Sequence, residues 1–202
     1  MTSLVSPFKL FVGDLNYFRI GSNQGLGDEL RAYFADPSND DLWKLVTNRQ
    51  RLTHALRFTE TIHLYALKDL PAGSDTSQAN QWMDIQPLAQ SDIGVFKKAI
   101  NWFEEILLST GAAHVEFGRI FVSKLAAKSA IDTHTDSGKY FSYYDRFHFT
   151  VTEADQNFLL CGDDGWFMDA DSLYWFNNHA PHYLLNHSSK DRINFIIDAR
   201  LS

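Results

Sequence analysis

The chain has 202 residues, of which 45% are hydrophobic, 14% aromatic and 21% charged, and its formal net charge is −7. This composition excludes disorder and low complexity, and it fits one globular domain that can bury a full core. The acidic balance disfavours a nucleic-acid partner, because a net negative surface repels phosphate backbones. The single cysteine excludes an internal disulfide and a cysteine-based zinc site, so histidines and carboxylates must hold any metal.

No segment resembles a signal peptide, and no apolar run approaches the roughly 20 residues that a membrane-spanning helix needs. We therefore expect a cytoplasmic protein with no membrane partner. No sequence pattern indicates an oligomeric state.

The amino-terminal half predicts helices and mixed structure. A weak helix is expected over 27–34. A stronger helix is expected from Ser91, its predicted cap, through Leu108, because apolar residues recur at three- and four-residue spacing and Gly111 follows the end. Small polar residues over 71–81 predict a loop.

From His114 onward the pattern alternates with period two, which predicts successive strands. The expected strands are Val115–Leu125, Phe141–Val151, Phe158–Cys161, Leu173–Phe176, His182–Asn186 and Arg192–Ala199. Helices followed by antiparallel strands predict an α+β, mainly β fold, a two-sheet jelly roll or barrel braced by the amino-terminal helices. We treat 1–202 as one domain, with helical and mixed support in 1–112 and the β core in 113–202.

Histidines concentrate in the β half, where five of the eight lie between His134 and His187. The segment His134-Thr-Asp136 places an imidazole and a carboxylate at i and i+2, and in extended backbone both side chains leave the same face. About one such pair is expected by chance in this composition, so a third ligand must come from elsewhere. The candidates are His179, His182 and His187, and His182 is preferred because it begins a strand.

Arg192 is a candidate anion-binding residue. If the turn 187–191 closes a hairpin, Arg192 lies four residues along the sheet from His182, roughly 13 Å away. A small diacid bridges that span, with one carboxylate at the metal and the other in a bidentate pair with the guanidinium. The alternative is an exposed arginine at a sheet edge.

Other polar residues in the predicted strands favour the same kind of site. Arg146 and His148 share one strand face, where two cationic side chains favour an anion, although a solvent-exposed polar face fits the pattern equally well. Ser123 faces inward and needs a hydrogen-bond partner, as an ordinary core serine also does. Aromatic residues that fit pocket walls or plain packing are Tyr143, Tyr144, Trp166 and Trp175.

Taken together, these residues resemble the aspartyl/asparaginyl β-hydroxylase-like branch of the iron(II)/2-oxoglutarate oxygenases, which includes some free-proline hydroxylases. The resemblance covers roughly residues 119–200. Its motifs are, in chain order, Ser123, His134-Thr-Asp136, Arg146-Phe-His148, Trp175-Phe-Asn-Asn, His182, Asn186 and Arg192. It implies an oxygenase domain with a double-stranded β-helix, a jelly-roll fold of the cupin type.

The resemblance implies a role for each of seven side chains. Iron(II) would be bound by His134, Asp136 and His182. The far carboxylate of 2-oxoglutarate would be held by Arg192 and Ser123, and the carboxylate nearest the metal by Arg146 and His148. The implied activity is hydroxylation of an unactivated C–H bond of an amino acid, free or peptide-borne, with O₂ as co-substrate and release of succinate and CO₂.

The sequence departs from the family pattern at one position, and two alternative functions remain open. Animal aspartyl hydroxylases have a small residue in place of the metal-binding aspartate, whereas this chain keeps Asp136, which is more similar to bacterial members. The first alternative is a cupin-like metalloenzyme that does not use 2-oxoglutarate and releases no succinate. The second is a non-enzymatic β-sandwich module that binds anions and has no stoichiometric affinity for iron.

Overall fold

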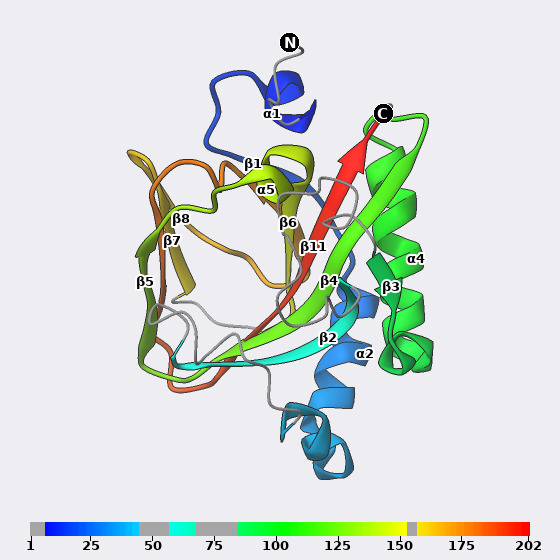
Figure 1. Ribbon diagram of the computed structural model, residues 1–202. Helices are drawn as coiled ribbons and strands as arrows, with labels where there is room; N and C mark the ends of the chain where they lie inside the picture. Colours follow the sequence, from blue (N-terminus) through cyan, green and yellow to red (C-terminus); the bar gives the residue numbers. More distant parts are fainter. Residues whose placement is uncertain (1–6, 45–56, 68–84, 153–156) are drawn as a thin grey trace, which may run out of the picture.

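The computed structural model describes residues 7–44, 57–67, 85–152 and 157–202, which form two antiparallel sheets facing each other across a barrel (Figure 1). The large sheet contains, in spatial order, β1 (Tyr17–Ser22), β9 (Ser172–Phe176), β6 (Asp145–Thr150), β11 (Arg192–Leu201), β4 (Val115–Leu125), β2 (Thr59–Leu67) and β3 (Ile85–Pro87). The small sheet contains β5 (Ser129–His134), β10 (His182–Asn186), β7 (Asn157–Cys161) and β8 (Asp164–Phe167). The predicted mainly β jelly roll is confirmed.

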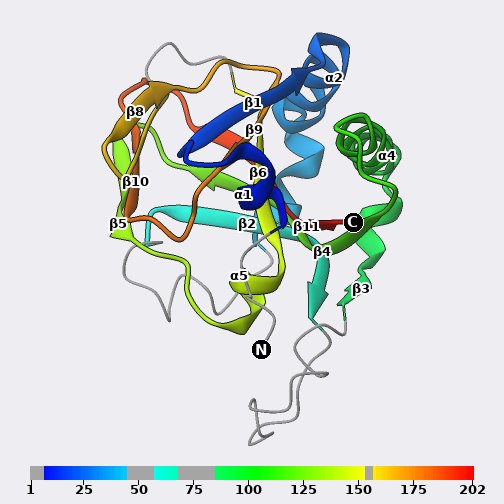
Figure 2. The same ribbon diagram turned by 90° about the horizontal axis from the view of Figure 1, so that it is seen from above.

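Helices cover the outer face of the large sheet. Figures 1 and 2 show α2 (Gln24–Ala35) and α4 (Gly94–Leu108) against this face, opposite the small sheet. The remaining helical segments are α1 (Pro7–Val12), η1 (Pro37–Lys44), η4 (Ala89–Asp92) and α5 (Lys139–Tyr143). In the described residues, no helix is both long and apolar enough to span a membrane.

The strand alternation divides the apolar residues between two cores. On β6, Phe147 and Phe149 face the helices and lie in the larger core, while Arg146, His148 and Thr150 are buried on the barrel side. A second, smaller core between the two sheets contains Leu125, Leu159, Cys161, Trp166, Met168, Tyr174, Phe176 and Leu184. The barrel side of β6 is therefore buried, and the alternative of a solvent-exposed polar face is wrong.

The spacing in α4 correctly predicts its buried face, because Phe96, Phe103 and Leu107 are fully buried in the larger core. The predicted cap is wrong. The helix begins at Gly94, and the hydroxyl of Ser91 instead donates to the carbonyl of Leu88 within the preceding 3₁₀ turn.

Three strand predictions need correction. The segment expected as one strand, Phe141–Val151, begins in the helix α5 and becomes β6 only at Asp145. The strands β5 and β8 are not among the expected strands. The amino-terminal half also supplies β1, β2 and β3 to the large sheet, so both halves of the chain build the barrel.

The expected hairpin between His182–Asn186 and Arg192 is also wrong. β10 pairs with β5 and β7 in the small sheet, whereas β11 pairs with β4 and β6 in the large sheet. The connecting turn therefore crosses between the sheets. The side-chain amide of Asn186 stabilises this crossing by donating to the carbonyls of Leu125, Ala126 and Lys190.

Candidate active site

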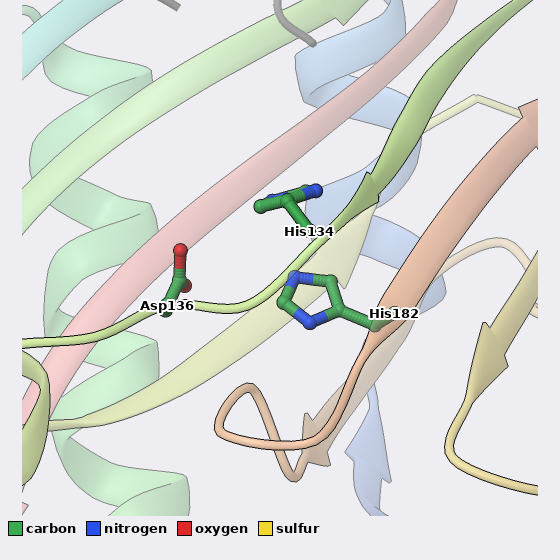
Figure 3. A group of neighbouring side chains, drawn as sticks. All are labelled: His134, Asp136 and His182. Atoms are coloured by element: carbon green, nitrogen blue, oxygen red, sulfur yellow. The ribbon is translucent and has the colours of Figure 1, made fainter.

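Three predicted metal ligands lie together inside the barrel. His134 ends β5 and His182 begins β10, and the two residues are direct partners in the antiparallel ladder. Their ring centroids are 4.3 Å apart. One ligand atom from each imidazole and one from Asp136 all lie within 4.8 Å of one another (Figure 3).

Backbone carbonyls select the nitrogen that each imidazole can offer. Nδ1 of His134 lies 2.8 Å from the carbonyl oxygen of Asp132, and Nδ1 of His182 lies 3.0 Å from that of Ala180. A carbonyl only accepts hydrogen bonds, so in the neutral form of each ring Nδ1 carries the proton and Nε2 keeps its lone pair. Burial lowers the pKa of His182 to about 4, which keeps this ring neutral near pH 7.

Asp136 is oriented by two side chains. Its Oδ2 accepts from Nη1 of Arg146 at 2.7 Å and from the amide of Asn178 at 3.0 Å, so neither donor uses Oδ1. Burial raises the pKa of Asp136, but the charge of Arg146 and the bond from Asn178 outweigh burial and hold it below its ordinary value. The carboxylate is therefore ionised and fixed.

Arg146 and Asp198 form a buried ion pair that supports this carboxylate. The two residues are opposite each other in the β6–β11 ladder, and Nε and Nη2 of Arg146 donate to Asp198 at 2.7 and 3.0 Å. Tyr140 donates a further bond to Oδ2 of Asp198 at 3.0 Å. Gly118 leaves room for this contact, because a Cβ there would meet the Tyr140 hydroxyl at 2.6 Å.

Among the residues expected to contact 2-oxoglutarate, Arg146 thus bonds two carboxylates of the chain itself. His148 is buried on the same face of β6, with its ring 4.8 Å from that of Phe176. Ser123 is buried on β4 and faces into the barrel beside Asn194 of β11.

Arg192 is a buried cation with no carboxylate in ion-pair contact among the described residues. It is 4% exposed, and its Nη2 contacts Sδ of Met168 at 2.9 Å. The side-chain amide of Asn194, turned so that its oxygen accepts, lies 2.8 Å from the same nitrogen. Its Nε is buried without a hydrogen-bond partner. Burial lowers the pKa of Arg192 to about 9. An unpaired buried cation is unfavourable, so this position suits an anion.

A row of buried polar side chains crosses the large sheet beside Arg192. Ladder pairing aligns Thr61 of β2, Ser123 of β4, Asn194 of β11 and Thr150 of β6. The hydroxyls of Thr61 and Thr150 are buried without partners. The opposite sheet adds two further unpartnered groups, the Asn157 amide and the Trp166 indole nitrogen. This part of the barrel interior therefore favours a polar ligand over an apolar one.

The profile of the family described as Aspartyl/Asparaginyl beta-hydroxylase matches residues 75–201. The chain belongs to the aspartyl/asparaginyl β-hydroxylase family. The predicted family is thereby confirmed, and the protein is an iron(II)/2-oxoglutarate-dependent hydroxylase with iron(II) and 2-oxoglutarate as its cofactors.

Solved structures share the fold of this hydroxylase at low sequence identity. A viral collagen prolyl hydroxylase from Paramecium Bursaria Chlorella virus-1, a complex with 2OG, has a TM-score of 0.54 at 11% identity, over 94% of this chain and 98% of that chain. A 2OG-Fe(II) oxygenase family oxidoreductase from Burkholderia pseudomallei has a TM-score of 0.53 at 8% identity, over 70% and 67%. The non-heme monooxygenase ThoJ, a nickel complex, has a TM-score of 0.55 at 13% identity, over 92% and 74%. No curated protein matches the sequence.

The aromatic residues proposed as pocket walls of the hydroxylase separate into two groups. Trp166 lies in the core between the sheets and stacks on Tyr17, with ring centroids 4.0 Å apart. Trp175 lies in the helix-side core, and Tyr143 and Tyr144 donate their hydroxyls to Glu116. Only Trp166 in this set thus belongs to the core between the sheets.

Sequence reasoning missed several polar residues of the hydroxylase site. Thr150 shares the period-two face of Arg146 and His148, so the alternation was a usable signal for it. Asn178 stands in the motif Trp175-Phe-Asn-Asn, but the motif assigned it no role, because its bond to Asp136 depends on the turn before β10. Asp198 gave no signal, because its pairing with Arg146 depends on strand register.

Proposed function

We propose that this hydroxylase binds iron(II) through Nε2 of His134, Nε2 of His182 and a carboxylate oxygen of Asp136, and that it hydroxylates an amino acid, free or within a peptide. The observation that carries the proposal is the convergence of these three ligand atoms within 4.8 Å. Two imidazoles and one carboxylate form the donor set of non-heme iron(II) oxygenases, which leaves coordination positions for small ligands.

The surrounding residues fit this metal. Each imidazole donates its Nδ1 proton to a carbonyl, a contact that fixes the ring and directs Nε2 inward. Arg146 and Asn178 hold one oxygen of Asp136, and their charge and hydrogen bonds keep the carboxylate ionised. The ligand set is thus preorganised by the chain.

We further propose that Arg192 binds the far carboxylate of 2-oxoglutarate, together with Ser123. Arg192 supplies a buried, otherwise uncompensated charge, and Ser123 lies in the polar row beside Asn194. A carboxylate placed here forms charge-assisted hydrogen bonds with the guanidinium. Arg146 acts differently in this proposal, because each of its three nitrogens already donates to Asp136 or Asp198, and it orients the metal ligand. His148 remains a proposed contact for the co-substrate's near carboxylate.

When bound together, iron(II), 2-oxoglutarate and O₂ supply the oxidising chemistry that hydroxylates an unactivated C–H bond and yields succinate and CO₂. The chain's part is to hold the ligands, neutralise the co-substrate's carboxylate and enclose the reaction between two packed sheets. Enclosure protects reactive species from side reactions with water.

The test is 2-oxoglutarate turnover, measured as succinate release, in variants of the histidines. His134→Ala and His182→Ala should each abolish turnover while the circular-dichroism spectrum stays unchanged. His187→Ala is the matched control, because this exposed histidine lies in the turn after β10. Parental turnover in either triad variant would refute the ligand assignment, and metal-dependent activity without succinate would indicate a different metalloenzyme.

A further inference from the structure

Arg119 is a second guanidinium beside the cluster that supports Asp136. It lies on β4, and its Nε is 3.3 Å from Oδ2 of Asp198. Its guanidinium carbon lies 4.0 Å from the ring centroid of Tyr140 and 5.1 Å from that of Phe141. An ion pair and two aromatic rings therefore hold this side chain in one orientation.

Arg119 and Arg146 differ in how many of their side-chain nitrogens form hydrogen bonds. In Arg146, Nε, Nη1 and Nη2 all donate to carboxylates of the chain. In Arg119, Nη2 is shielded from solvent and has no hydrogen-bond partner, while the side chain as a whole is 26% exposed. An unmet buried N–H is costly, so this edge of the guanidinium favours an acceptor, best of all a carboxylate.

Arg119 is linked to the proposed metal site through one carboxylate and one guanidinium. Asp198 bonds both Arg119 and Arg146, and Arg146 in turn bonds the proposed metal ligand Asp136. The positive charges of Arg119 and Arg146 balance the negative charges of Asp136 and Asp198. Iron(II) and dianionic 2-oxoglutarate also balance, so Arg192 leaves one uncompensated positive charge in the loaded site. This excess positive charge favours a carboxylate group on the substrate.

We propose that Arg119 binds a carboxylate of the substrate, and this inference rests on the proposed hydroxylase function. Two sources supply such a group, the α-carboxylate of a free amino acid and the side-chain carboxylate of an aspartate or glutamate within a peptide. Arg119 selects against substrates that lack a carboxylate, because its buried N–H then stays unpaired.

The experiment follows the Nε–H signal of Arg119 by nuclear magnetic resonance in protein labelled with isotopic arginine. The protein is loaded with Zn(II), a diamagnetic replacement for iron(II), and with 2-oxoglutarate. Three sets of probes are titrated: the standard free L-amino acids, the corresponding amino-acid amides, and N-acetylated aspartate and glutamate amides. Arg119→Met assigns the signal, and Arg200→Met is the matched control because Arg200 also stacks on a tyrosine ring, that of Tyr143.

We expect at least one carboxylate probe to shift the Arg119 signal saturably. If free amino acids do so and their amides do not, the α-carboxylate is the recognised group; if the N-acetylated acidic amides do so, it is a side-chain carboxylate. The active probe should increase succinate release, and Arg119→Met should raise its apparent KM at least about tenfold. Arg119→Lys should recover part of the affinity and Arg200→Met all of it.

Three results would overturn the inference: no carboxylate probe shifts the signal, acids and amides bind equally, or Arg119→Met keeps the parental KM. Failure of the proposed function itself is a separate result, since it appears as absent Zn(II) or 2-oxoglutarate binding before any probe is added. Carboxylate binding at Arg119 is read directly from its own signal in either case.

Discussion

Replacing Arg192 with methionine should have opposite effects on stability and on co-substrate binding. Burial lowers the pKa of Arg192 from 12.5 to about 9. One pKa unit corresponds to about 1.4 kcal/mol, so the unpaired charge costs the folded state about 5 kcal/mol at most. Replacing buried ion pairs by apolar side chains of similar volume is often neutral or stabilising, by up to about 4 kcal/mol. We expect Arg192→Met to raise the free energy of unfolding of the ligand-free protein within this range.

The same substitution removes the proposed partner of 2-oxoglutarate. A ligand at one hundred times its Kd stabilises a folded protein by about 2.7 kcal/mol, so 2-oxoglutarate with Zn(II) should raise the Tm of the parent clearly above that with Zn(II) alone. This added stabilisation should disappear in Arg192→Met.

The assay is urea unfolding of the free protein together with thermal unfolding in the presence of Zn(II), with and without 2-oxoglutarate. Arg200→Met, in the same strand, is the control and should keep the stabilisation by 2-oxoglutarate. If Arg192→Met destabilises the free protein by more than about 1 kcal/mol, Arg192 is not an unfavourable buried charge. If the variant keeps the parental response to 2-oxoglutarate, Arg192 does not bind the co-substrate.

Two further predictions concern the residues around the site. Gly118→Ala should destabilise the protein by about 1–3 kcal/mol, because the added Cβ displaces the Tyr140 hydroxyl from Asp198. Gly94→Ala is the control and should not destabilise it, because a Cβ there meets nothing within 4 Å. Equal free energies of unfolding for the two variants would contradict this prediction. Burial raises the pKa of Asp145 from 3.8 to about 6, so the folded state binds the carboxyl proton more tightly than the unfolded state does. The free energy of unfolding should therefore fall as the pH rises from about 4 to above 6. Asp145→Asn should flatten that part of the pH profile measured by urea unfolding, and an unchanged slope would show that another group is responsible.

Strongly patterned elements were predictable from the sequence, and polar edge strands were not. The apolar spacing of α4 correctly indicated its buried residues, and the alternation of β6 correctly separated its aromatic face from its polar face. β5 was missed because its residues are half-buried or exposed, and β8 because Asp164-Gly165 resembles a turn. Backbone pairing with neighbouring strands stabilises both, and such pairing leaves no apolar pattern.

The sequence indicated which residues form the site, but it did not indicate the hydrogen bonds between them. The motif His134-Thr-Asp136 and the strand-initial His182 were found from spacing, and the family match then supported the chemistry. Arg146 was expected to contact the co-substrate, yet its bonds to Asp136 and Asp198 depend on how β6 and β11 align. Strand register of this kind is set by tertiary packing.

Anomalous scattering from a crystal grown with Zn(II) locates the metal that the three side chains are proposed to hold. We expect a single strong peak bonded at about 2.0–2.2 Å to Nε2 of His134, Nε2 of His182 and an oxygen of Asp136. A peak bonded to Nδ1 of either ring, or a peak remote from these residues with none between them, would show that these side chains do not form the proposed metal site.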